Sequence, residues 1–127
     1  MQDRPTASEL LSSIADLLEK QVLGATQGAL RHSVRVAGNL CRILEREAEA
    51  GADLERREVE LLAEVLGESP ADGDALRLSR TLSERLDASD DRALEKRAHA
   101  ALIGIVRGKL SIAKPGHDAY DFSAELD

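Results

Sequence analysis

The sequence is almost without aromatic side chains. Its 127 residues contain one tyrosine, Tyr120, one phenylalanine, Phe122, and no tryptophan, and both aromatics lie within the last eight residues. Aromatic side chains usually go into cores, where each buries a large apolar area. We therefore expect a core built from leucine, alanine, valine and isoleucine, and a different use for the two aromatics.

The sequence also lacks a disulfide framework, a long apolar run and an excess of positive charge. Cys41 is the only cysteine, which excludes an intrachain disulfide framework and suits a reducing compartment, so we expect a cytoplasmic protein. No apolar run approaches the roughly 20 residues that span a bilayer, and the first residues carry Asp3 without a basic stretch, unlike a signal peptide. A net charge of −7 argues against nonspecific nucleic-acid binding, which depends on neutralising phosphates.

Apolar residues recur at helical spacing in five segments. Thr6 and Glu9 form a capping-box pattern at the start of the first segment, and Gly51 and Asp53 separate the second segment from the third as a stop and a cap. Ser89 or Asp90 is the expected cap of the last helix. The predicted helices lie at about 6–24, 26–50, 53–66, 74–86 and 92–113.

Five helices with short connections predict an all-α fold, an antiparallel bundle with a long central second helix. The predicted bundle domain covers residues 1–116, and residues 117–127 form an acidic tail that carries both aromatics. Because apolar residues cover about half of the second helix, we expect Leu40, Cys41 and Leu44 to be buried. Leu44→Ala should then cost about 2–5 kcal/mol, as large-to-small core changes do.

Polar side chains recur along one edge of the second predicted helix. The members of this arginine ladder are Arg31, Arg35, Asn39, Arg42 and Arg46. Steps of four and three residues place them within an arc of about 80°. Guanidinium groups suit phosphate or carboxylate, so the ladder is a candidate site for an anion or an acidic partner. The other interpretation is that these arginines pair with acids of the same chain, Glu45 among them.

The sequence contains no assembled catalytic set. Asp91, Glu95 and His99 lie four residues apart, the minimal arrangement for general base work or for two metal ligands, yet no second carboxylate–histidine pair accompanies them. We expect a structural or solvated role for them, no metal and no cofactor. Gly104 and Gly108 form a small-residue seam that permits close helix approach.

The aromatic tail leaves two alternatives open. Tyr120 and Phe122 are separated by one residue, so in an extended segment both point to the same side. Either the tail is free, as terminal residues often are, or the aromatics anchor it in an apolar groove. That groove would belong to the same chain or to a second copy, in which case the tail would clasp a homodimer.

Four segments of the sequence are distinctive: "RPTASELL" at 4–11, "RVAGN" at 35–39, "ILERE" at 43–47 and "LEKRAHAALIGIVRGKLSIAKPG" from Leu94. Together they resemble a bacterial family of small helical proteins of unknown function. The resemblance covers most of the chain from Arg4 to about Gly116. Members often have an aromatic residue and a histidine ahead of the RVA segment, where this chain has His32 and Ser33. Their genes often neighbour aminoglycoside-phosphotransferase-like kinases and acyl-CoA dehydrogenases.

The resemblance implies an accessory protein for such a neighbouring enzyme. We therefore expect a non-catalytic interaction protein whose partner is a kinase-like or acyl-CoA-metabolising enzyme. The alternative is a binder of a phosphorylated or CoA-type small molecule that uses the arginine ladder. A third interpretation is a self-assembling structural dimer.

Overall fold

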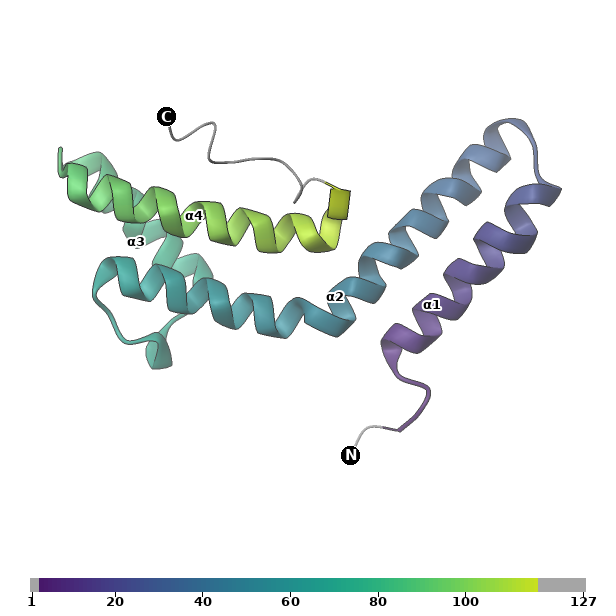
Figure 1. Ribbon diagram of the computed structural model, residues 1–127, viewed down its shortest axis with the longest axis horizontal. Coiled ribbons are helices and arrows are strands. Elements are labelled where there is room, and N and C mark those ends of the chain that lie inside the picture. Colours follow the sequence, from purple (N-terminus) through teal and green to yellow (C-terminus); the bar gives the residue numbers. More distant parts are fainter. Residues whose placement is uncertain (1–2, 117–127) are drawn as a thin grey trace. The chain divides into compact units, whose positions relative to one another are not determined.

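A computed structural model of the chain describes residues 3–116, and the predicted tail with Tyr120 and Phe122 lies outside them. The described residues form helices and no strand, which confirms the all-α prediction (Figure 1). The elements in chain order are α1 (Ala7–Leu17), the π-helical turn η1 (Leu18–Val22), the 3-10 turn η2 (Leu23–Ala25), α2 (Gly28–Leu66), the 3-10 turn η3 (Pro70–Asp72), α3 (Ala75–Ala88) and α4 (Arg92–Ala113). No helix of the described part is long and apolar enough to cross a membrane.

The prediction of five helices is wrong by one, because the second and third predicted helices are a single helix, α2. Gly51 and Asp53 lie inside it. A glycine in a helix interior costs only about 1 kcal/mol relative to alanine, and the residues around Gly51 are mostly alanine, glutamate and arginine, which are strong helix formers. Asp53 pairs with Arg56 at 2.8 Å, one turn further along the helix, and caps nothing. The prediction of a long second helix is therefore confirmed.

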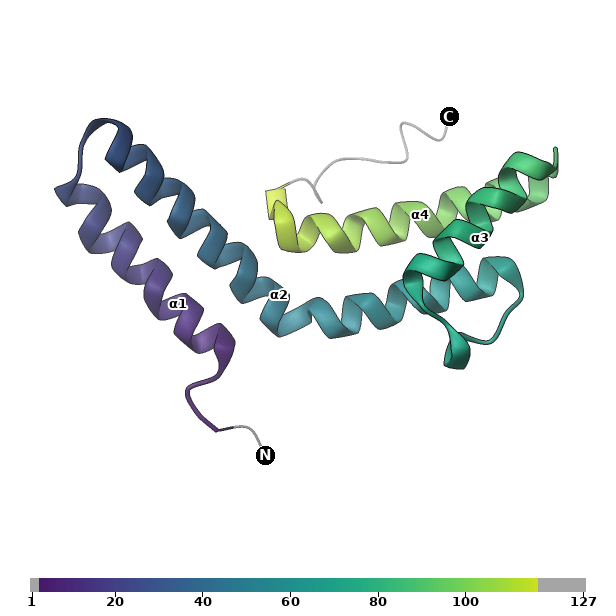
Figure 2. The same cartoon turned by 180° about the vertical axis from the view of Figure 1, so that it is seen from behind.

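The chain divides into two compact units, one up to Ala52 and one from Asp53 onward. In the first unit α1 and the first part of α2 lie side by side and antiparallel, and we call residues 3–52 the hairpin (Figures 1 and 2). Thr6 caps α1 as predicted, since its hydroxyl accepts from the Glu9 amide at 3.2 Å.

Small residues line the contact between the two helices of the hairpin. Ala15 is 0% exposed and is the only buried apolar side chain among the described residues of this unit. Opposite, Gly38 is buried, and a Cβ there would lie 3.4 Å from the Glu19 side chain. The helices approach closely, and their contact buries few large apolar groups.

The prediction that Leu40, Cys41 and Leu44 are buried is wrong. Leu40 and Leu44 are 53% and 52% exposed, and Cys41 is half-buried. The buried part of α2 is its C-terminal end instead, where Leu62 is 1% exposed. Helical periodicity identifies an apolar face correctly, but no described residue of the hairpin covers it.

The core of the second unit is formed by three helices, α3, α4 and the end of α2. Its buried members are Leu62, Ala63, Val65, Leu66, Leu78, Leu82, Leu94, Ala98, Ala101 and Ile105. The glycine seam of α4 permits close helix approach as predicted, and the helix that it meets is α2: Gly104 faces Leu61, and a Cβ on Gly108 would lie 3.1 Å from Leu54. An ion pair between Lys109 and Glu58 joins the same two helices at 3.2 Å.

Local signals fix the ends of these helices. Gly67 has a φ of +71°, a conformation that favours glycine, and it ends α2 with bonds from its own amide to the Glu64 carbonyl and from the Glu68 amide to the Ala63 carbonyl. Asp91 caps α4 by accepting from the Leu94 amide at 3.1 Å. The expected caps Ser89 and Asp90 are therefore wrong by one or two positions.

Candidate functional site

Arg42 is the centre of a closed polar cluster in the hairpin. Its guanidinium donates to Asp16 at 2.7 Å, to Glu19 at 2.9 Å and to Glu45 at 3.0 Å. It also reaches the Ser12 hydroxyl at 3.4 Å. Two of these carboxylates come from the helical segment before the turn and one from α2 itself, so Arg42 joins both helices of the hairpin.

The cluster shifts the ionisation of its members. Hydrogen bonds from Arg42 hold the pKa of both Asp16 and Glu19 below their ordinary values, against a smaller opposing effect of burial. The same bonds raise the pKa of Arg42. Lys20 adds a second positive charge 3.5 Å from Asp16, so three carboxylates face two cations, and an incoming anion would meet net negative charge at this position.

The remaining members of the arginine ladder do not converge on one point. Arg31 donates to the Leu23 carbonyl at 3.0 Å and so closes the turn of the hairpin. Arg35 and Asn39 are exposed, and Arg46 is half-buried and engaged in an interaction of its own. That the ladder binds an anion or a partner stays a prediction. The carboxylates that pair with Arg42 already occupy that position of the ladder.

The hairpin also carries large apolar side chains that are about half exposed. Those that lie on one side of it, which we call the hairpin face, are 47% to 62% exposed. They are Leu10, Ile14 and Leu17 of α1 and Leu30, Leu40 and Leu44 of α2. Val36 of α2 is 44% exposed outside this face, and among the described residues of the second unit Leu76, Leu102 and Val106 are 40% to 61% exposed.

Helix geometry places both halves of the hairpin face on the same side. Ala15 faces α2, and Ile14 lies about 100° to one side of it, while the acidic partners of Arg42 lie on the other side. On α2, Gly38 faces α1, with Arg42 about 40° to one side and Leu44 about 120° to the other. Because the Arg42 cluster marks one edge of the helix–helix contact, Ile14 and Leu44 lie toward the opposite edge, while Leu17 and Leu40, about 160° from the contact, point further away from it.

Sequence reasoning identifies the residues of this face but not their exposure. Their stripes at steps of four and three are visible in the sequence, and periodicity alone assigns them to a core. A signal of the exposure is present in α1, where Leu10, Ile14 and Leu17 form a second stripe beside the one that packs on α2. Two apolar stripes on one helix indicate two neighbours, and the hairpin supplies one.

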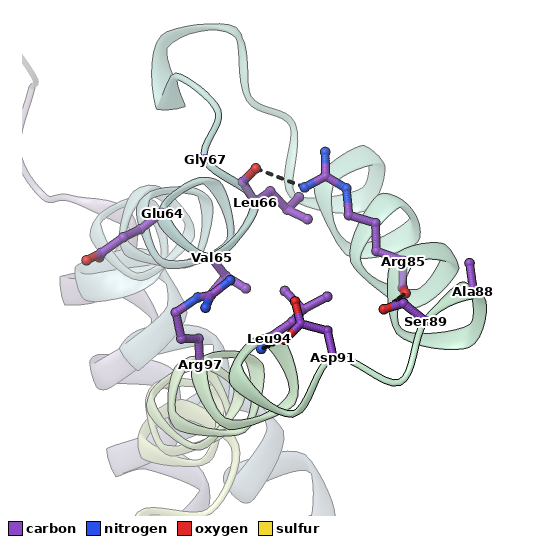
Figure 3. Close-up of a pocket in the computed structure, with 10 residues that line it drawn as sticks. All are labelled: Glu64, Val65, Leu66, Gly67, Arg85, Ala88, Ser89, Asp91, Leu94 and Arg97. Carbon is purple, nitrogen blue, oxygen red and sulfur yellow. Dashed lines mark hydrogen bonds between the residues drawn. The ribbon is translucent and has the colours of Figure 1, made fainter.

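An open cavity of about 530 Å³ lies in the second unit, between the end of α2, the end of α3 and the start of α4 (Figure 3). Its lining residues are Glu64, Val65, Leu66, Gly67, Arg85, Ala88, Ser89, Asp91, Leu94 and Arg97. The polar groups are largely used by helix ends. Arg85 donates to the Leu66 carbonyl at 3.0 Å, and Ser89 donates to the Arg85 carbonyl at 3.2 Å. Asp91 caps α4, so Glu64 and Arg97 are the charged side chains of the lining that these contacts leave available to a ligand.

Asp91, the first residue of the candidate acid–base set, has a structural role. Asp91 caps α4, Glu95 lies in the first turn of the same helix, where a carboxylate is favourable, and His99 is exposed. Within residues 3–116, no group of three or more histidine, cysteine or acidic side chains is placed to hold a metal ion.

One comparison with known proteins gives a match. The model of DUF6285, a domain of unknown function, matches residues 24–117. The match includes α2, α3 and α4 and begins after α1, so the "RPTASELL" segment of the expected resemblance lies outside it. No curated protein and no solved structure matches the chain.

Proposed function

The chain belongs to the DUF6285 family, a domain of unknown function, and from this premise we propose that it is a non-catalytic interaction protein that binds another protein through the hairpin face. The family assigns no activity, so the proposal depends on the chemistry of the surface. The observation that carries it is the exposure of six large apolar side chains on one side of two helices.

Burial of this face would be strongly favourable. Complete burial of a leucine or isoleucine side chain contributes about 1.5–3 kcal/mol, and each member of the face is about half exposed. While water covers these six half-exposed side chains, roughly 4–9 kcal/mol of favourable burial free energy is not realised. Contiguous apolar patches on proteins mark interaction surfaces, whereas scattered exposed leucines are ordinary.

The family resemblance suggests which proteins are candidates. Genes of similar proteins often neighbour aminoglycoside-phosphotransferase-like kinases and acyl-CoA dehydrogenases, so an accessory role toward such an enzyme is part of the proposal. An apolar helical face suits this role, because amphipathic helices and the grooves that receive them are a common mode of protein recognition.

The alternative function is a binder of a phosphorylated or CoA-type molecule through the arginine ladder. Arg35 is exposed to solvent, which is the observation in its favour. Against it, Arg42 is held by three carboxylates, and Arg31 is bonded to a backbone carbonyl. An anion site needs several converging donors, so protein binding through the hairpin face has the stronger support.

The test is an affinity capture from extract of the native cell, with the tagged full chain and two variants. Leu44→Glu places a charge in the hairpin face, and Leu76→Glu makes the same change at a leucine that is 61% exposed on α3. We expect the wild type and Leu76→Glu to recover a protein in near-equal amount to the bait, and Leu44→Glu to lose it. Recovery that is identical for all three chains would refute the proposal.

A further inference from the structure

Each helix of the hairpin has two apolar stripes and one neighbour within the hairpin. On α1, the stripe around Ala15 packs on α2, and a second stripe of Leu10, Ile14 and Leu17 is exposed. On α2, the side around Gly38 packs on α1, and Leu30 and Leu44 lie in a second exposed stripe. Helices with two stripes about a quarter turn or more apart are typical of four-helix bundles, in which each helix touches two others.

Ile14, Leu30 and Leu44 lie about 80–120° from the helix–helix contact on the same side of the hairpin, so a neighbour on that side would meet both helices. A single amphipathic helix would lie in the groove between α1 and α2 and leave the outer part of both stripes in water. A second hairpin fits the width. It presents the same pair of stripes, and a twofold axis brings identical apolar surfaces into self-complementary contact.

From this geometry we infer that the protein bound to the hairpin face is a second copy of this chain, and that the two hairpins form a four-helix bundle. The inference rests on the proposed function, since it names the partner of the same face. A second copy then takes the place of an enzyme on this face, and an accessory role toward an enzyme would use another surface of the dimer.

The charge distribution fits a second copy better than a charged partner. Residues 3–52 contain six basic and seven acidic residues, so the hairpin has a net charge of −1, while the rest of the chain has eleven basic and seventeen acidic residues and a net charge of −6. Two hairpins therefore repel each other little, although the whole chain is acidic. The Arg42 cluster satisfies its own charges on the far edge of the hairpin and leaves the leucine edge without a buried ion to desolvate.

The experiment is sedimentation equilibrium of the purified full chain from about 1 µM to about 200 µM, a range over which association by mass action is visible. One chain has a mass of 13.7 kDa, and a dimer has twice that mass. We expect the dimer mass for the wild type and for Leu76→Glu. Leu44→Glu should weaken association by at least about 30-fold, as expected for a central interface residue, and sediment near 13.7 kDa.

Helix content by circular dichroism controls for folding of the variant. If Leu44→Glu does not fold, thermal unfolding of the wild type decides instead, because the melting temperature of a dimer rises with protein concentration. A wild type that is monomeric at all concentrations overturns the inference, and so does a dimer that Leu44→Glu leaves intact.

The two proposals fail separately. A monomeric wild type that still captures a protein from extract in a Leu44-dependent way refutes the second copy and retains the proposed function. Capture that does not depend on Leu44 refutes the proposed function, whatever the purified chain does alone.

Discussion

Replacing a leucine by alanine should have different consequences in the two units. Leu62 is 1% exposed in the three-helix core, so Leu62→Ala should cost about 2–5 kcal/mol of unfolding free energy at any protein concentration. Leu44 is 52% exposed, so about half of its burial is realised within one chain. Leu44→Ala should therefore cost only about 1 kcal/mol in the single chain, and about 1 kcal/mol more per copy where a second hairpin covers it.

Urea unfolding at about 1 µM and about 200 µM protein separates these contributions, because only association depends on concentration. The cost of Leu44→Ala should rise between the two concentrations, and the cost of Leu62→Ala should stay constant. If Leu44→Ala costs as much as Leu62→Ala at both concentrations, the same chain covers the face and the reasoning is wrong. If Leu44→Ala causes the same small loss of unfolding free energy at both concentrations, nothing covers the hairpin face.

Four further predictions concern other parts of the chain. Arg42 lowers the pKa of two carboxylates in the folded state, so its stabilisation is present at neutral pH and lost as the pH falls through those lowered values. Arg42→Ala should flatten the decline of melting temperature in acid, and an unchanged decline would contradict the cluster. Gly104→Ala should stabilise the fold by about 0.5–1 kcal/mol in urea unfolding, and Gly108→Ala by less, because a side chain of α2 must move aside; the reverse order would refute the seam geometry. Millimolar phosphate, ATP or acetyl-CoA should leave the melting temperature unchanged, and a rise that Arg35→Ala abolishes would favour the small-molecule alternative. If the tail docks, deletion of residues 117–127 should lower the melting temperature or the sedimenting mass, and no change in either would show that the tail is free.

Features encoded by neighbouring residues could be predicted from the sequence. The Thr6 cap, the predicted helix end at about residue 66 and the glycine seam of α4 each depend on a short pattern, and all three are confirmed. The prediction of a helix end at Gly51 is wrong because a glycine marks such an end only where the flanking residues do not favour continuing the helix. Its neighbours in "EREAEAGADLERRE" do favour it.

Features that depend on which residues pack against a helix could not be predicted from the sequence. The apolar stripe that contains Leu44 looks the same in a sequence whether its neighbour is in the same chain, in another chain or in water. The partners of Arg42 were equally hidden, because Asp16 and Glu19 lie 26 and 23 residues away and meet it only through the hairpin. Only Glu45, one turn away on the same helix, was visible as a partner.

The central claim is that a protein covers the hairpin face, and crosslinking in the native cell tests it most directly. A photoreactive amino acid placed at Leu44 should give one discrete adduct on illumination, with twice the 13.7 kDa mass of a single chain. The same amino acid at Leu76, which is also an exposed leucine, should give none. A discrete adduct of another mass would mean that a different protein, and not a second copy, covers the face. The absence at Leu44 of any adduct above the background at Leu76 would contradict the claim.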